Sequence, residues 1–152
     1  MRTDQFIPQL IVIGGAQAMD FYRRDFDAQE LMRTLTPDGE KLVHGELAID
    51  GHKFYVSDET DASHGGTCKS PKSLGGTSVR ITLYVDDADR IFQQAILAGA
   101  TALMPVQDMF WGGRYGKLVD PFGHEWGIHQ EQKQQTEIET QKAADQYFAH
   151  RG

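Results

Sequence analysis

The 152-residue sequence contains very little cysteine and no long hydrophobic run. Cys68 is the single cysteine, which excludes an intramolecular disulfide and a cysteine-rich zinc site and favours a reducing compartment. Apolar runs such as residues 10–13 are far shorter than the roughly 20 residues that cross a membrane. The first five residues lack the apolar segment of a signal peptide, so we expect a cytoplasmic protein with no membrane partner.

Positive charge is also scarce. The chain has 15 Lys and Arg against 22 Asp and Glu, and its formal net charge of −7 predicts that it does not bind nucleic acid. The pairs Gly75-Gly76 and Gly14-Gly15 lack the further residues of phosphate-binding and dinucleotide-binding loops. The 8 Phe, 5 Tyr and 2 Trp supply a hydrophobic core, so the chain is globular and holds one domain or two small ones.

A weak internal repeat organises the sequence. Residues 12–19 align with residues 84–91 at an offset of 72, and residues 51–56 align with residues 123–128 at the same offset. Agreement at both ends of a unit of about 50 residues predicts a duplicated structure.

Each of the two units, 7–57 and 79–129, is predicted to fold as β-α-β-β-β, which makes the fold class α+β. Alternating β-branched residues indicate strands, and apolar residues at helical spacing indicate helices. The expected strands are 9–13, 30–34, 42–49 and 53–57, then 79–85, 101–104, 116–119 and 125–129. The expected helices are 16–26 and 88–98, the second capped by Asp86 or Asp87.

Two segments lie outside the units. Residues 58–78 are rich in Gly and Ser and are expected to form a long mobile loop. Residues 1–130 would form one domain, and residues 131–152 a polar tail or helix. This last segment either frays or forms a helix that uses Ile138, Tyr147 and Phe148 to pack on its own domain or on a second subunit.

A duplicated unit that ends in Asp120-Pro121-Phe122-Gly123-His124-Glu125-Trp126 resembles the vicinal oxygen chelate superfamily, which includes glyoxalase I, fosfomycin and bleomycin resistance proteins and extradiol dioxygenases. The chain is most similar to the PhnB-like branch. The supporting segments are 18–22, 44–47, 70–76, 105–112 and 114–116. The resemblance implies that the strands form a curved mixed sheet enclosing a cup for a small ligand, and that the chain forms a homodimer.

Metal-dependent relatives bind a divalent ion through His, Gln or Glu on the first and last strands of each unit. The resemblance places these positions at Ile7 or Gln9, Tyr55, Arg80 and Gly127. Only Gln9 is a usual ligand, because arginine carries a permanent positive charge and glycine has no side-chain donor. We therefore expect no metal or other cofactor.

Two other metal sites stay open as alternatives. Gln9, Glu125 and His129 could form a shifted site, since alternate residues of a strand point the same way. His44 and Glu46 share one strand face and could chelate, or they could bond to neighbouring strands.

The inward strand positions give the expected cup a polar lining. Arg80 would either pair with Glu125 or bind an anionic group, and Glu125 is the candidate base that positions or deprotonates a substrate. In the loop 110–115, Trp111 and Tyr115 could stack on a planar ligand or fill the core. The candidate ligand-binding residues are Gln9, Tyr55, Arg80, Thr82, Trp111, Arg114, Tyr115, Glu125 and His129.

Three functions follow as hypotheses. The first is a metal-independent protein that binds a small anionic or aromatic molecule. The second is a metal-dependent enzyme of glyoxalase, resistance or dioxygenase type. The third is a non-catalytic structural or regulatory protein whose cup is filled by its own side chains.

Overall fold

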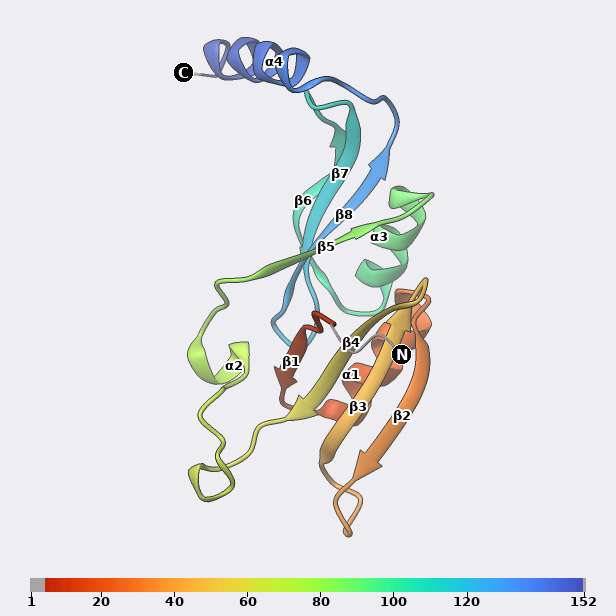
Figure 1. Ribbon diagram of the computed structural model, residues 1–152, viewed down its shortest axis with the longest axis vertical. Coiled ribbons are helices and arrows are strands. Elements are labelled where there is room, and N and C mark those ends of the chain that lie inside the picture. Colours follow the sequence, from red (N-terminus) through yellow and green to blue (C-terminus); the bar gives the residue numbers. More distant parts are fainter. Residues whose placement is uncertain (1–4, 152) are drawn as a thin grey trace. The chain divides into compact units, whose positions relative to one another are not determined.

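The computed structural model describes residues 5–151, which form two compact units (Figure 1). The first unit comprises residues 5–79 with 120–124, and the second comprises residues 80–119 with 125–151. Each unit contains one four-stranded mixed sheet, with strand order β1-β4-β3-β2 in the first and β5-β8-β7-β6 in the second. In both sheets the first strand pairs in parallel with the last, and the other neighbours are antiparallel. The predicted α+β duplication is therefore confirmed.

The first unit packs helix α1 against one face of its sheet. Met19, Tyr22 and Phe26, predicted at helical spacing, are buried on this side. Gly45 of the sheet allows the close approach, because a Cβ there would lie 2.4 Å from the Met19 sulfur. The elements are β1 (Gln9–Val12), α1 (Gly15–Asp25), β2 (Gln29–Leu35), β3 (Leu42–Ile49) and β4 (His52–Asp58).

The turn of residues 120–124 is a structural element of the first unit. The Asp120 carboxylate accepts backbone N–H groups of Phe122 at 2.9 Å and His124 at 3.0 Å, together with the hydroxyl of Tyr22 from α1. Nε2 of His124 lies 2.8 Å from the carbonyl oxygen of Ile11. The residues that carry the family resemblance most clearly thus serve packing and backbone pairing.

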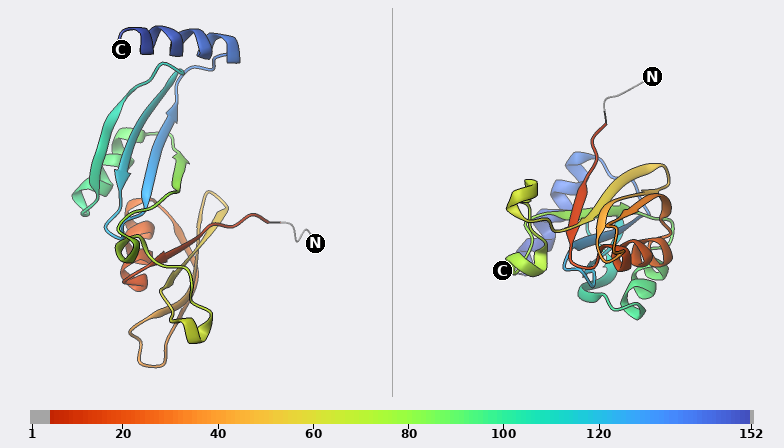
Figure 2. Two further views of the ribbon diagram at one scale, coloured as in Figure 1. Left: turned by 90° about the vertical axis from the view of Figure 1, so that its left-hand side faces the viewer. Right: turned by 90° about the horizontal axis from the view of Figure 1, so that it is seen from below.

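The second unit repeats the arrangement with helix α3 on its sheet (Figure 2). Asp87, one of the two predicted caps, accepts the N–H of Arg90 at 3.1 Å. Ile91 and Ala95 of the helix are buried, as are Trp126 and Ile128 of the sheet. The elements are β5 (Arg80–Tyr84), α3 (Ala88–Leu97), β6 (Thr101–Asp108), β7 (Gly113–Val119) and β8 (Glu125–Glu131).

The β6–β7 hairpin is longer than the sequence predicts. Strands were expected at 101–104 and 116–119, whereas β6 continues to Asp108 and β7 begins at Gly113. Pro105 lies within β6, which is an edge strand whose register shifts between Met104 and Gln107. An edge strand with an irregularity tolerates a residue that has no N–H to donate.

The segment 58–78 contains two short helices, η1 (Ala62–His64) and α2 (Pro71–Leu74). The Glu59 carboxylate accepts the N–H of Ser70 at 2.7 Å, and Ser70 is fully buried. The hydroxyls of Ser70 and Ser73, with this N–H, hold the pKa of Glu59 at about 2. This bond joins the start of the segment to the beginning of α2. The prediction of a long mobile loop missed these two helices.

Helix α4 (Glu137–Ala149) occupies most of the region left open as a tail or a helix. Thr136 and Glu139 form a capping box at its start, which satisfies two backbone N–H groups. Tyr147 and Phe148 contact the ring of Phe110 in the β6–β7 hairpin, at centroid distances of 5.1 and 6.2 Å. Among residues 5–151, no helix has the length and apolar character needed to cross a membrane.

Candidate functional site

The second sheet turns one face toward α3 and carries polar side chains on the other. Apolar residues such as Ile81, Trp126 and Ile128 alternate with this polar set along β5 and β8, because successive side chains of a strand point to opposite faces. Cross-strand pairing brings together three pairs: Arg80 with Glu125, Thr82 with Gly127, and Tyr84 with His129.

Arg80 and Glu125 form an ion pair at one end of this face. The Nε of Arg80 lies 3.3 Å from Oε2 of Glu125, and Nη2 lies 3.4 Å from Oε1. The hydrogen bond that Arg80 donates to Glu125, with a smaller contribution from Tyr115, raises the pKa of Arg80 above its ordinary value. The side chains are 39% and 21% exposed, so the pair is open to solvent and can meet a ligand.

Tyr115 of β7 fills the space above Gly127. A Cβ at Gly127 would lie 2.4 Å from the Tyr115 hydroxyl oxygen, so the phenol occupies the place that a side chain at 127 would take. The two family ligand positions in the second unit therefore present a paired guanidinium and a glycine covered by a phenol. Neither offers a lone pair to a divalent ion in the usual way.

In the first sheet, polar side chains form hydrogen bonds with one another. Nε2 of Gln9 donates to the Ser57 hydroxyl at 3.1 Å, and the ring of Tyr55 packs edge-on against His44 at 4.7 Å. His44 Nε2 lies 3.1 Å from Oε1 of Glu46. The two family ligand positions here, Gln9 and Tyr55, hold an amide and a phenol.

These donors do not fit the metal of the superfamily. Across residues 5–151, no group of three or more His, Cys, Asp and Glu is placed to hold a metal ion, and His44 and Glu46 gain no third ligand of these types. Glu125 and His129 lie four residues apart on β8, or about 13 Å at 3.3 Å per residue. That separation, with Glu125 already bonded to Arg80, does not suit a shared ion.

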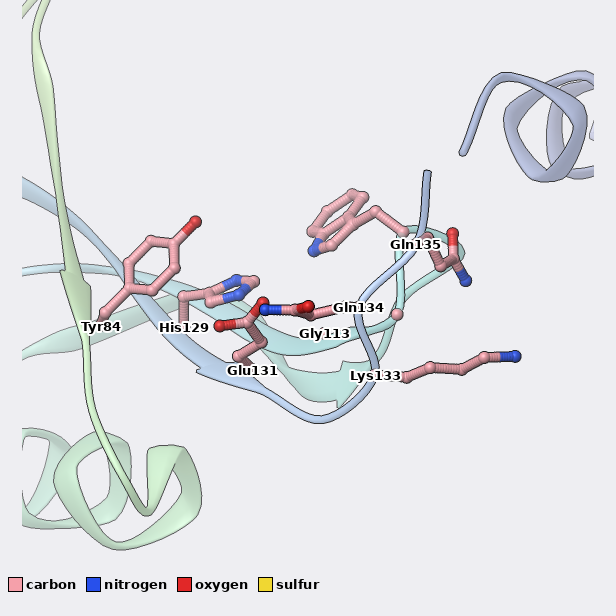
Figure 3. Close-up of a pocket in the computed structure, with 9 residues that line it drawn as sticks. Tyr84, Gly113, His129, Glu131, Lys133, Gln134 and Gln135 are labelled. Carbon is pink, nitrogen blue, oxygen red and sulfur yellow. The ribbon is translucent and has the colours of Figure 1, made fainter. Parts of the chain in front are cut away.

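A pocket of about 350 Å³ lies at the other end of the polar face (Figure 3). His129 forms its inner wall and is only 7% exposed, with its ring centroid 4.2 Å from that of Tyr84. Burial lowers the pKa of His129, while the nearby charge of Glu131 acts in the opposite direction. The residues that line it are Tyr84, Trp111, Gly112, Gly113, His129, Glu131, Lys133, Gln134 and Gln135.

The turn between β6 and β7 holds Trp111 over this pocket. Gly112 has a φ of +92°, a conformation that favours glycine, and its carbonyl accepts the N–H of Lys133 at 2.9 Å. Trp111 also packs edge-on against Tyr115, with centroids 5.5 Å apart. Phe110, the preceding residue, is held by α4. The sequence identified Trp111 and Tyr115 but missed residues 131–135, because the predicted strand ended at 129.

Arg114 lies on the opposite face of the sheet from the other candidates. It donates to both oxygens of Asp89 in α3, at 2.6 and 2.9 Å, and to Asp108 at 3.1 Å. These hydrogen bonds raise the pKa of Arg114. Its role is to fasten α3 to the hairpin, so it does not join the other predicted ligand-binding residues of this unit.

Comparison with known proteins agrees with the fold of the two units. Residues 6–128 match the Glyoxalase/Bleomycin resistance protein/Dioxygenase superfamily, and the chain belongs to that superfamily. An uncharacterized protein of Mycobacterium bovis is 47% identical over 123 residues, which are 81% of this chain and 80% of that protein.

Two solved structures show the same fold. The gene product At5g48480 of Arabidopsis thaliana matches with a TM-score of 0.66 and 28% identity, over 84% of this chain and 98% of the other. Protein PA1353 of Pseudomonas aeruginosa matches with a TM-score of 0.68 and 22% identity, over 86% and 100% of the two chains.

Proposed function

We propose that this chain binds a small molecule on the polar face of its second sheet, without the metal used by many members of the superfamily. Arg80 would hold an anionic group, and the pocket of Tyr84, Trp111 and His129 would hold an aromatic or apolar part. The observation that carries the proposal is the solvent-open Arg80 on the same strand face as a pocket of about 350 Å³.

The chemistry of the guanidinium supports the anion site. Glu125 approaches Nε and Nη2, which fixes the plane of the group and leaves other N–H groups to meet a carboxylate, phosphonate or phosphate. Glu125 then acts first as the residue that orients Arg80. A role for Glu125 as a base in a reaction is a separate prediction, and Glu125→Gln would abolish turnover if it holds.

The anion site is tested by titrating the protein with phosphate and with small carboxylates while following the melting temperature. Arg80→Ala should lower the affinity by about tenfold, since a hydrogen bond to a charged group contributes about 1.5–3 kcal/mol. Arg90→Ala removes the same charge from α3, which packs on the opposite face, and should leave the response intact. An equal response in wild type and Arg80→Ala would contradict the anchoring role.

Metal dependence is tested by elemental analysis of the purified protein, with ligand binding measured before and after a chelator. We expect binding to survive chelation, because the four family positions carry the side chains of Gln9, Tyr55 and Arg80 and the bare Gly127. Stoichiometric Mn, Ni, Fe or Zn whose removal abolishes binding would favour the second hypothesis, a metal-dependent enzyme.

We also propose a PhnB-like homodimer. The edge strands β2 and β6 support this, because Leu31, Met32 and Leu103 on them are between 42% and 51% exposed and open edges need covering. Light scattering of the purified protein tests it, and a monomer at all concentrations would contradict it.

A further inference from the structure

We propose that the pocket beside His129 recognises a hydroxyl group carried on the ring of its ligand. The hydroxyl oxygen would accept a hydrogen bond from the indole N–H of Trp111, and its hydrogen would be donated to the imidazole of His129. This inference rests on the proposed function, and it names the group bound at the opposite end of the face from Arg80.

Two nitrogen atoms converge above Gly113. The position that a Cβ of Gly113 would take overlaps Cε1 of His129, and it lies 3.0 Å from Nε2 of His129 and 3.0 Å from Nε1 of Trp111, so the two nitrogens lie near each other beside this glycine. The glycine has no side chain, so the space between these two nitrogens belongs to the pocket that all three residues line. A small polar atom further into the pocket, clear of Cε1 of His129, can approach both nitrogens.

His129 is buried with its hydrogen-bonding capacity unused. The residue is 7% exposed, and its ring nitrogens make no hydrogen bond to any other residue in the range 5–151. One face of the ring packs against Tyr84, so its contacts are with an aromatic ring and with the pocket. The ring nitrogens are not among the fully buried side-chain atoms that lack a partner, and His129 lines the pocket, so a ligand or water there can bond to them.

The polarity of the two nitrogens selects the group. The indole N–H can only donate, whereas an imidazole that carries its proton on Nδ1 can accept at Nε2. Burial lowers the pKa of His129, which keeps the imidazole neutral at neutral pH. A hydroxyl both accepts and donates, and therefore satisfies both nitrogens at once.

The remaining walls favour a neutral ring over an anion. In Figure 3 the Glu131 side chain lies beside His129, whereas the Lys133 side chain extends away from it. A carboxylate at this spot would meet the charge of Glu131 without a compensating cation. The volume of about 350 Å³ and the rings of Tyr84 and Trp111 suit one six-membered ring or a fused pair.

The test compares phenol, anisole and cyclohexanone as probes by calorimetry and by NMR of the imidazole resonances. Anisole keeps the ring and the acceptor oxygen but has no hydroxyl hydrogen to donate, and cyclohexanone offers only a carbonyl acceptor. Phenol should bind about fivefold to tenfold more tightly than anisole, which corresponds to one hydrogen bond. Trp111→Phe should remove most of this preference, whereas Arg90→Ala, on α3 and outside the pocket, should retain it.

Gly113→Ala provides a second variant: its Cβ would overlap Cε1 of His129, so the imidazole must shift, and the preference for phenol should be lost. Equal binding of phenol and anisole, tighter binding of cyclohexanone, or no binding of any probe up to its solubility limit would overturn the inference. The preference for phenol can be present while the phosphate response of Arg80 is absent, in which case the anion site fails and this inference stands. If phosphate binding depends on Arg80 but phenol is not preferred over anisole, the anion site stands and the hydroxyl site is wrong.

Discussion

The two units of this chain share strand order, pairing and a covering helix, yet their polar faces differ in the side chains that they carry. In the first unit Gln9 bonds to Ser57, and His44 bonds to Glu46. In the second unit the cation Arg80 pairs with Glu125 and stays 39% exposed. Each unit has a pocket of similar volume, about 340 Å³ beside Gln9 and Ser57 and about 350 Å³ beside His129, but only the second is walled by Trp111 and a buried histidine. The residues on the apolar face of each sheet therefore determine the fold. The alternate residues, on the polar face, can differ between the units without changing the fold, and so can acquire a binding role.

The largest expected effect separates the two polar faces directly. Arg80→Ala should remove the phosphate-induced rise in melting temperature, because it deletes the cation on the second face. Gln9→Ala removes a neutral amide that is bonded to Ser57 on the first face, and it should keep the rise within error. Loss of the response in Gln9→Ala and not in Arg80→Ala would reverse the assignment of the faces.

A second substitution concerns the structural role of the first unit. Tyr22→Phe deletes the hydroxyl that donates to the buried Asp120 carboxylate. We expect the free energy of unfolding to fall by about 1–3 kcal/mol, as measured by urea denaturation. Tyr84→Phe is the matched change in the second unit, where Tyr84 is 70% exposed, and it should have little effect on stability. Equal losses in the two variants would show that Asp120 does not depend on this bond.

The sequence predicted the frame of both units well because strand alternation and helical spacing depend only on neighbouring residues. Strand β3 was predicted with its observed ends, β1 and β5 lie wholly within their predicted ranges, and the other strands were predicted in part. Only the outer part of the β6–β7 hairpin was missed, because residues 110–115 with Gly112-Gly113 indicate a loop. Without a strand at Gly113 no face could be assigned to Arg114, which is why it was placed with the ligand-binding residues.

The pocket was harder to predict for the same reason. Its outer wall, residues 131–135, follows the predicted end of β8, and its shape depends on the hydrogen bond from Lys133 to Gly112. Such a contact between two turns leaves no periodic signal in the sequence. The pairing of Tyr84 with His129, by contrast, follows from the parallel register of β5 and β8.

A third prediction links α4 to the pocket. Phe110→Ala removes the ring that Tyr147 and Phe148 contact, and so loosens the turn that carries Trp111. Phenol affinity should fall by about threefold to tenfold in a calorimetric titration, because the indole N–H is no longer held in place. Phe6→Ala, a change of the 97% exposed phenylalanine of the first unit, should have no effect. An unchanged affinity in Phe110→Ala would show that the contact between α4 and Phe110 does not contribute to phenol binding.

The smallest expected effect is on the pH dependence of stability. The folded pKa of His129 lies below its ordinary value of 6.5, so the unfolded chain binds more protons between these two pKa values. The contribution of His129 is thus fully present above pH 6.5 and is lost as the pH falls toward the folded pKa. Groups that face or approach the ring are Tyr84, Tyr115, Glu131 and Lys133.

This pH effect is measured by denaturation between pH 7.5 and pH 5, with His129→Phe as the reference variant. The difference in unfolding free energy between the two proteins should change in favour of the variant as the pH falls. A difference that stays constant would show that His129 titrates alike in the folded and unfolded chains.

The central claim, that the polar face of the second sheet is the binding face, is tested most directly by mapping NMR shifts during phosphate and phenol titrations. Phosphate should shift the resonances of Arg80 and Glu125, and phenol should shift those of Trp111, Gly113 and His129. The resonances of the first-unit residues Gln9, His44 and Tyr55 should stay in place. Shifts confined to these first-unit residues would contradict the account.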